Sequence, residues 1–187
     1  MNAETKQQVV ELIREKGYER RPEPFRLTSG EMSHDYVDGK RAIADGADLR
    51  LVAQAMLDLC EASGIEFNAA GGLTLGADPL AHAIAIVGEK KWFTVRKEAK
   101  GHGTKSRVEG ARLSKGDRVL LVEDVVTTGG SIVQALQPIV ETGAEIVFAT
   151  AIMDRGKSAS DRLGEHGVKF VPICTYEDLG IDPVGSS

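Results

Sequence analysis

The amino-acid sequence predicts an α/β fold built on a parallel β-sheet with helices on both faces. Short runs rich in valine, isoleucine and alanine alternate along the chain with segments whose apolar residues recur at helical spacing. The predicted strands are apolar throughout rather than alternately apolar and polar, which is typical of strands that are buried on both faces of a sheet. These two observations together favour helices packed above and below one sheet.

The amino-terminal region is predicted to form a helix followed by two short strands. Within residues 1–17 the apolar side chains follow helical spacing. The same residues lack the apolar core and cleavage site of a secretory signal, so a cytoplasmic location is expected. A proline-bearing stretch at 21–24 leads into two strands around a Ser-Gly turn between Phe25 and Val37.

Helices and strands alternate through the rest of the chain. Helices are predicted at 47–63, 77–87, 131–141 and 158–166, and strands at 67–73, 92–96, 119–123, 146–153 and 168–173. Gly64 is well placed to end the first of these helices. Because ligands bind beyond the carboxyl ends of strands in such sheets, the residues after each strand are the candidates for a functional site.

The strongest functional signal lies in residues 119–131, VLLVEDVVTTGGS. A buried strand ends there in two adjacent carboxylates, Glu123 and Asp124, whose oxygens can accept hydrogen bonds from a vicinal diol of a sugar. Two glycines and three hydroxyl side chains then precede a helix, which favours a phosphate-binding turn. The combination predicts binding of ribose 5-phosphate. Taken alone, the same residues also suit a helix cap after a solvated strand end.

A basic segment follows the strand predicted at 92–96. Residues 96–107, RKEAKGHGTKSR, carry five Lys or Arg side chains against one acid, together with two glycines. Such a segment is expected to form a lid over an anion and to stabilise the charge of a leaving diphosphate. A solvated basic loop is the plainer alternative. Because GHGTKS matches a Walker A loop only in part, hydrolysis of nucleoside triphosphates is not expected.

Composition excludes several other classes of protein. The chain of 187 residues suits one domain, and its net charge of -5 argues against a nucleic-acid partner. Its apolar runs are far shorter than the roughly 18 to 20 residues that span a bilayer, so no membrane partner is expected. Cys60 and Cys174 lack the spacing of a zinc site or a disulfide framework and are expected in the core.

Two of these segments resemble segments of a known family. Residues 119–131 resemble the phosphoribosyl diphosphate signature of the type I phosphoribosyltransferases. The pattern R-K-x-x-K-x-H-G, which begins at Arg96, resembles the flexible catalytic loop of the orotate phosphoribosyltransferases. The resemblance covers about residues 20–178. It implies the type I phosphoribosyltransferase fold as a single domain over 1–187, in which about residues 1–45 contribute the amino-terminal helix and a substrate hood.

The resemblance also assigns roles to individual residues. It implies that Lys100, His102 and Asp124 are catalytic, that Thr127 and Arg155 contact orotate, and that no residue is a firm metal ligand. The residues implied to bind the phosphoribosyl diphosphate are Arg96, Lys97, Lys100, His102, Glu123, Asp124, Val125, Val126, Thr127, Thr128, Gly129, Gly130 and Ser131. An arginine after a strand can fork onto a planar carboxylate. A surface ion pair of Arg155 with Asp154 or Asp161 is the plainer alternative.

The predicted hood matches the family pattern S-G-x-x-S-x-x-Y-x-D through Ser29, Gly30, Ser33, Tyr36 and Asp38. Two places depart from the family. Thr28 stands where many relatives have a lysine before S-G, and in the pyrophosphate-side loop at 71–81 the Tyr-Lys pair of many members is replaced by Leu75 and Gly76. Both departures concern affinity for the diphosphate rather than the type of reaction.

The resemblance implies transfer of the 5-phosphoribosyl group from 5-phosphoribosyl 1-diphosphate to N1 of orotate. The products would be orotidine 5'-monophosphate and diphosphate, in the de novo synthesis of pyrimidines (UMP). Mg²⁺ would be held largely by the diphosphate, the ribose hydroxyls and water. A homodimer is implied, in which Arg96, Lys100 and His102 act in the neighbouring subunit's site while Lys97 acts in its own. A phosphoribosyltransferase for another base, or a regulator that senses a nucleotide on the same fold, are the alternatives.

Overall fold

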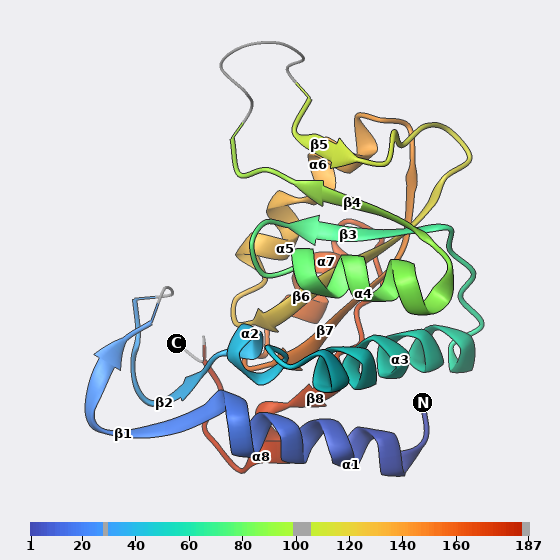
Figure 1. Ribbon diagram of the computed structural model, residues 1–187. Helices are drawn as coiled ribbons and strands as arrows, with labels where there is room; N and C mark the ends of the chain where they lie inside the picture. Colours follow the sequence, from blue (N-terminus) through green and yellow to red (C-terminus); the bar gives the residue numbers. More distant parts are fainter. Residues whose placement is uncertain (28–29, 99–105, 185–187) are drawn as a thin grey trace.

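The computed structural model describes residues 1–27, 30–98 and 106–184 (Figure 1). The strands are β1 (Tyr18–Arg26), β2 (Met32–Val37), β3 (Ala69–Leu73), β4 (Lys91–Val95), β5 (Val108–Gly110), β6 (Arg118–Val126), β7 (Glu145–Asp154) and β8 (Cys174–Thr175). The helices are α1 (Ala3–Leu12), the π-helical turn η1 (Ile13–Gly17), α2 (Gly39–Ala42), α3 (Gly46–Ala62), α4 (Asp78–Gly88), α5 (Gly130–Gln134), α6 (Leu136–Val140), α7 (Ala159–Gly164) and α8 (Tyr176–Leu179).

Six strands form one sheet in the order β5-β4-β3-β6-β7-β8, and β1 and β2 form a separate antiparallel hairpin. Every neighbouring pair in the six-stranded sheet is parallel except β4 and β5. The predicted α/β class is therefore confirmed, with one antiparallel strand at an edge. Because the parallel strands point the same way, the segments after β3, β6 and β7 meet at one edge of the sheet.

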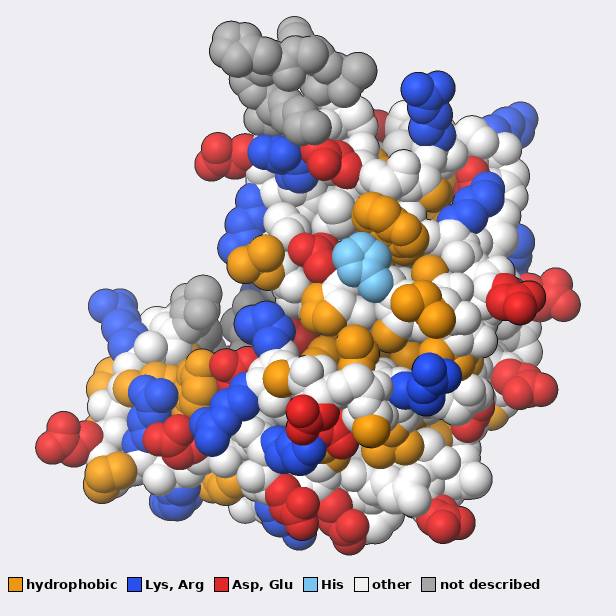
Figure 2. Space-filling view, viewed as in Figure 1, with side chains coloured by type: hydrophobic (Ala, Val, Ile, Leu, Met, Phe, Trp, Pro, Cys, Tyr) orange, Lys and Arg blue, Asp and Glu red, His pale blue; other side chains and the backbone are white. Residues whose placement is uncertain are grey.

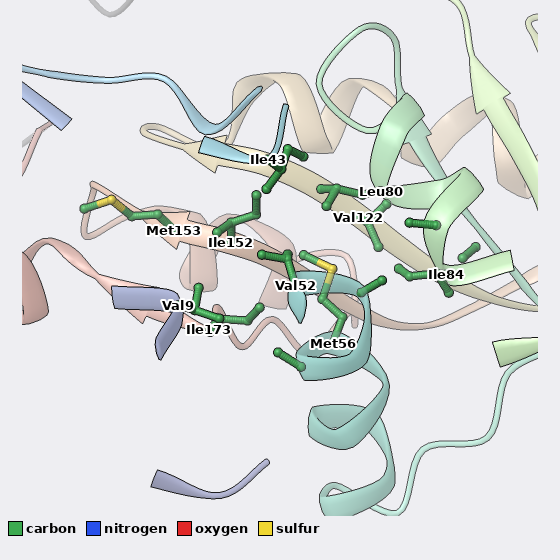
Figure 3. Packing of buried hydrophobic residues seen from close by; sticks show 14 of the residues in the cluster. Val9, Ile43, Val52, Met56, Leu80, Ile84, Val122, Ile152, Met153 and Ile173 are labelled. Atoms are coloured by element: carbon green, nitrogen blue, oxygen red, sulfur yellow. The ribbon is translucent and has the colours of Figure 1, made fainter. Parts of the chain in front are cut away.

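Two hydrophobic cores lie on the two faces of this sheet. Strand β6 sends Leu120 and Val122 into one core and Val119 and Leu121 into the other, as the twofold alternation of a strand requires. Figure 3 shows side chains of α3 and α4 packed over β6 and β7 in the first core. The second core is covered by α5, α6 and α7, so both faces are buried and the strands are apolar throughout.

The amino-terminal hairpin projects beside the sheet in Figure 1 and corresponds to the predicted hood. Strand β1 begins at Tyr18, earlier than the sequence predicted, and includes Pro22 and Pro24. The pairing with β2 shifts between Arg20 and Phe25, where these prolines lie. A proline removes a backbone donor, and a two-stranded hairpin tolerates this because one edge of each strand has no partner.

Two predicted boundaries around the candidate site are wrong. Strand β6 does not end at the carboxylates but continues to Val126, because it pairs with β7 as far as Asp154. The helix predicted at 131–141 is divided at Ala135 into α5 and α6. Pro138 follows this break by about one helical turn. It has no N–H to donate to the carbonyl of Gln134.

The strand predicted at 168–173 forms only in part. This segment runs beside β7, with an isolated bridge between Ala149 and Phe170 and a backbone bond from Ile173 N–H to Ala151 O of 2.9 Å. Pro172 interrupts the ladder because it cannot donate, and the regular strand β8 begins after it. The edge strand is therefore shorter and later than the apolar pattern indicated.

The sequence analysis missed three elements, β5, α2 and α8. Each has three or four residues, which is too short for a periodic pattern to indicate it. Cys60 and Cys174 are buried free thiols, as predicted. No helix in the described part of the chain combines the length and the apolar character needed to cross a membrane.

Candidate active site

Two adjoining cavities open at the edge where β3, β6 and β7 end. The larger lobe has a volume of about 800 Å³ and the smaller lobe a volume of about 710 Å³. Both are lined by Lys40, Leu73, Lys97, Asp124, Val125 and Ser131. Because they share these residues, the two lobes belong to one site at the position where the sequence analysis expected it.

Glu123 and Asp124 form an acidic pair near the end of β6. Their exposed fractions are only 5% and 7%, and the backbone N–H of Asp124 donates to Glu123 Oε1 at 3.2 Å. Burial and the adjacent charge of Asp124 raise the pKa of Glu123 well above its ordinary range. The pair therefore retains a proton more readily than two isolated carboxyls, and it can offer both an acceptor and a donor to a sugar diol.

The loop after β3 presses against this acidic pair. A Cβ atom at Gly76 would lie 2.1 Å from Glu123 Oε1 and 2.5 Å from Asp124 Oδ1. No lysine or other side chain fits at Gly76 unless the loop or the carboxylates move, so the backbone itself lines the larger lobe here. The hydroxyl of Thr74 donates to Asp78 at 2.7 Å and braces the same loop against α4.

The predicted phosphate loop joins β6 to α5. Its residues Thr127, Thr128, Gly130 and Ser131 line the smaller lobe. Gly129 has a φ of 79°, and a Cβ atom there would lie 3.2 Å from the Cα atom of Ala159, so this turn requires glycine. Hydroxyl groups and the first N–H groups of a helix are suitable ligands for a phosphate.

Arg155 is the largest fully buried side chain of the described residues and lines the smaller lobe. Its Nη1 donates to the backbone carbonyl of Asp35 at 2.7 Å. Its Nε and Nη2 are also buried, and within the described residues they have no hydrogen-bond partner. A buried guanidinium with two unpaired donors costs free energy unless a ligand pairs with it, and a planar carboxylate matches its fork.

The hood supplies an aromatic wall to the smaller lobe. Phe25 and Tyr36 line it, and their rings meet edge to face with centroids 5.5 Å apart. The guanidinium of Arg21 lies 4.4 Å from the centre of the Tyr36 ring. Asp35 is buried and accepts from the Tyr18 hydroxyl at 2.8 Å. The lobe that contains Arg155 thus has both a charged fork and aromatic side chains against which a flat ring can pack.

The basic segment is described only in part. Arg96 and Lys97 line the larger lobe, where Arg96 Nη1 pairs with Glu109 Oε1 at 3.1 Å. Lys100 and His102 lie outside the described residues, as do Thr28 and Ser29 of the hood pattern. The structure therefore brings together the acidic pair, the phosphate loop, Arg155 and the start of the basic segment.

Sequence reasoning missed one cation in this site. Lys40 lines both lobes, and its Nζ lies 3.0 Å from Asp124 Oδ2. Burial lowers the pKa of Lys40, but the hydrogen bond and charge of Asp124 outweigh it and the net shift is upward. The available signal was its place two residues after Asp38, directly behind the hood pattern.

Comparisons with known proteins agree with this geometry. A family model described as a phosphoribosyl transferase domain matches residues 69–175. The orotate phosphoribosyltransferase of Pyrococcus furiosus is 41% identical over 155 residues, which cover 83% of this chain and 85% of the relative. The orotate phosphoribosyltransferase of Aquifex aeolicus is 38% identical over 182 residues, which cover 93% of this chain and 97% of the relative.

Solved structures give the same result. Orotate phosphoribosyltransferase from Mycobacterium tuberculosis, in complex with Fe(III) dicitrate, matches with a TM-score of 0.79 at 32% identity, over 95% of this chain and 99% of that one. The fold and the site thus define a phosphoribosyltransferase. Within that class, the chain belongs to the orotate phosphoribosyltransferase family, since identity of about 40% extends over most of both chains. The resemblance stated from the sequence is confirmed.

Proposed function

We propose that the two lobes transfer the 5-phosphoribosyl group from 5-phosphoribosyl 1-diphosphate to orotate, giving orotidine 5'-monophosphate and diphosphate. This enzymatic reaction of pyrimidine biosynthesis is the one that the family carries out. The observation that carries the proposal is Arg155, buried in the wall of the smaller lobe with two unpaired donors among the described residues. Orotate has a carboxylate for this fork, whereas uracil and the purines do not.

The acidic pair and the phosphate loop hold the part of the donor that remains. Glu123 and Asp124 bind the ribose hydroxyls, and the phosphate loop surrounds the 5-phosphate through Thr127, Thr128, Gly130 and Ser131. When the bond at C1 breaks, positive charge develops on the ribose ring. Carboxylates fixed nearby in a largely buried position stabilise that charge.

The acceptor lies in the smaller lobe. Arg155 forks onto the orotate carboxylate, Thr127 contacts the same ring, and the aromatic wall limits how the ring can tilt. Orotate N1 attacks as an anion, so the chain does not need a strong base. Its contribution is to hold N1 and C1 in line and close together, which removes much of the entropic cost of the encounter.

The basic segment acts on the part of the donor that leaves. Lys97 lines the larger lobe of its own subunit next to the loop at Gly76, which supports placing the diphosphate in this lobe, whereas Arg96 of the same subunit pairs there with Glu109. Lys100 and His102 complete the segment as catalytic donors to the leaving oxygens in this proposal. Cationic donors there lower the energy of the transition state because negative charge grows on the diphosphate as the bond breaks.

The donor chemistry of the site suits a Mg²⁺ ion that arrives with the diphosphate. In the part of the chain that the structure describes, no group of three or more Asp, Glu, His or Cys side chains could hold an ion. Mg²⁺ prefers oxygen ligands and keeps several waters, so the diphosphate, the ribose hydroxyls and water can hold it beside Asp124. When bound, the ion neutralises charge on the diphosphate.

An exposed apolar face supports the proposed homodimer. Ile86 and His82 lie one turn apart on α4, and the His82 ring meets the Trp92 ring edge to face at 4.5 Å. Ile86 is 74% exposed and Trp92 40%, and Leu75 from the loop before α4 is 73% exposed. Figure 2 shows orange side chains gathered around a histidine on this face. A second copy of the chain that covered this face would bury these exposed apolar side chains.

Ile86→Asp tests the dimer. We expect this variant to be monomeric in light scattering, because it places a charge in an apolar interface. Val140→Asp is the matched control, since Val140 is 55% exposed on α6 and should leave the assembly unchanged. A monomeric wild-type protein would contradict the proposal.

Mixing two inactive variants tests whether the site is shared. If the site takes Lys100 from one subunit and Asp124 from the other, each mixed dimer of Lys100→Ala and Asp124→Asn has one intact site. A randomly exchanged equimolar mixture should then regain about a quarter of wild-type activity. No recovery after verified subunit exchange would show that Lys100 acts in its own subunit.

The reaction itself is tested by following the ultraviolet absorbance of orotate with 5-phosphoribosyl 1-diphosphate and Mg²⁺. Loss of orotate with release of diphosphate is expected. Consumption of adenine or hypoxanthine instead would contradict the orotate assignment, and nucleotide binding without turnover of any base would indicate a regulator. The cytoplasmic location expected from the amino-terminal sequence stays a prediction.

A further inference from the structure

Lys40 is carried to the acidic pair by close packing between the hood and the sheet. Helix α2 begins at Gly39, where a Cβ atom would lie 2.9 Å from Asp124 Cβ and 3.0 Å from Val125 Cγ2. Glycine therefore lets the helix start lie directly on the end of β6. The next side chain along the helix, Lys40, is placed over Asp124 by this contact.

Lys40 pairs with a carboxylate oxygen of Asp124 that the sugar needs as an acceptor. Its Nζ lies 3.0 Å from Asp124 Oδ2 and 3.8 Å from Asp38 Oδ1, and its side chain is 52% exposed. A ribose hydroxyl that binds Oδ2 must displace the ammonium. Because the lysine is half exposed on a flexible stem, it can move without unpacking the core.

The loop after β3 supplies no cationic side chain where Gly76 approaches the acidic pair. A Cβ atom at Gly76 would lie too near both carboxylates for a side chain at this position. Among the described residues, the cations that line the larger lobe are Lys40, Arg96 and Lys97, and Arg96 is already paired with Glu109. Lys40 is the one of these three that borders the acidic pair itself.

We propose that Lys40 exchanges partners during the reaction: it neutralises Asp124 in the free enzyme and pairs with the diphosphate of the donor once the ribose hydroxyls take Asp124. This inference rests on the proposed function. The diphosphate is attached at C1, next to the hydroxyl that binds the carboxylate, so its charge arrives beside the acidic pair. A cation between the two negative groups removes their repulsion and adds a charge-assisted hydrogen bond.

The exchange predicts which ligands depend on Lys40. A ligand that carries the diphosphate gains the new ion pair, whereas ribose 5-phosphate must displace Lys40 and gains nothing in return. Loss of the ammonium should therefore weaken the binding of 5-phosphoribosyl 1-diphosphate by about tenfold or more. It should leave ribose 5-phosphate equally or more tightly bound.

The test compares Lys40→Met, Lys40→Arg and Arg41→Met with the wild-type enzyme by calorimetric titration with both ligands and by steady-state kinetics. Arg41 is the matched control because it lies on the same helix, is 60% exposed and pairs with Glu19 away from the lobes. We expect Lys40→Met to raise KM for the diphosphate donor and to spare KM for orotate. Lys40→Arg should restore most of the affinity, and Arg41→Met should behave as the wild type.

Two results would overturn the inference while the wild type still consumes orotate. If Lys40→Met weakened the binding of both ligands equally, the lysine would only position Asp124. Unchanged or tighter binding of 5-phosphoribosyl 1-diphosphate would mean that the ammonium never reaches the diphosphate. A wild type that does not use orotate would instead contradict the proposed function, so the two failures are distinguishable.

Discussion

On the proposed donor side of the site, the acidic pair and the phosphate loop come from one continuous segment, residues 123–131, whereas the proposed acceptor side is assembled from β1, β2, the loop after β6 and the end of β7. The donor side is fixed by the sheet, because β6 lies between β3 and β7. The acceptor side depends on the hood remaining against the sheet, through contacts such as that of Arg155 with Asp35. The difference teaches that one half of the site belongs to a central strand of the sheet, whereas the other half depends on contacts between segments that are distant in sequence.

Asp124→Asn should have the largest effect and should act on the donor side. The substitution removes a charge from the acidic pair and leaves Lys40 only its longer ion pair of 3.8 Å with Asp38. We expect kcat/KM for 5-phosphoribosyl 1-diphosphate to fall on the order of 10²- to 10³-fold, as for loss of a transition-state contact in a buried site. Glu145→Gln, an exposed change in β7, is the control. A loss confined to KM for orotate would contradict the division between the two sides.

Arg155→Lys should impair the use of orotate and leave the binding of the diphosphate donor nearly unchanged. Lysine keeps the charge but cannot fork onto a carboxylate, so kcat/KM for orotate should fall by about 10²-fold. Titration with 5-phosphoribosyl 1-diphosphate should give nearly the wild-type affinity. Because Arg155 is buried, thermal unfolding must be measured alongside. Equal loss for both substrates in a stable variant would show that the halves are not independent.

Asp154 is buried beside the acceptor side of the site, and we expect it to make the stability of the fold depend on pH. Burial raises the pKa of this carboxyl from 3.8 to about 6. Between these values the folded protein retains a proton that the unfolded chain has released, so stability falls as pH rises and the loss is complete above the raised pKa.

Asp154→Asn should remove that dependence. An asparagine Oδ1 can still accept from Gly156 N–H, a bond of 2.9 Å in the native protein. The variant should unfold at a higher temperature than the wild type near about pH 7.5 and at a similar temperature near about pH 4. A stabilisation that is the same at both values would mean that the proton is not its cause.

Tyr18→Phe should have the smallest effect and should sharpen how the hood is held. It removes the hydroxyl that donates to buried Asp35 at 2.8 Å, which we expect to cost about 1 kcal/mol in the free energy of unfolding. A rise of a few-fold in KM for orotate, with KM for the donor unchanged, should accompany it. A change in KM for the donor alone would contradict the role of the hood in binding the acceptor.

Sequence reasoning succeeded where one segment carries the chemistry. The acidic pair and the phosphate loop could be predicted because their order along the chain is their order in space. It failed where neighbours come from distant segments. Nothing near Lys40 in sequence indicates Asp124, since their contact depends on how closely α2 can approach β6.

The sequence by itself determined the α/β class, the position of the acidic pair and the glycine-rich turn at the end of one strand and, through its resemblance, the family. These follow from short-range patterns, namely apolar runs, the adjacent carboxylates and the glycine-rich turn. Only the tertiary structure decided that β6 extends past the carboxylates, that Arg155 is buried with two unpaired donors among the described residues, and that Lys40 faces Asp124. Burial and pairing between distant segments are properties of packing, and a local pattern does not contain them.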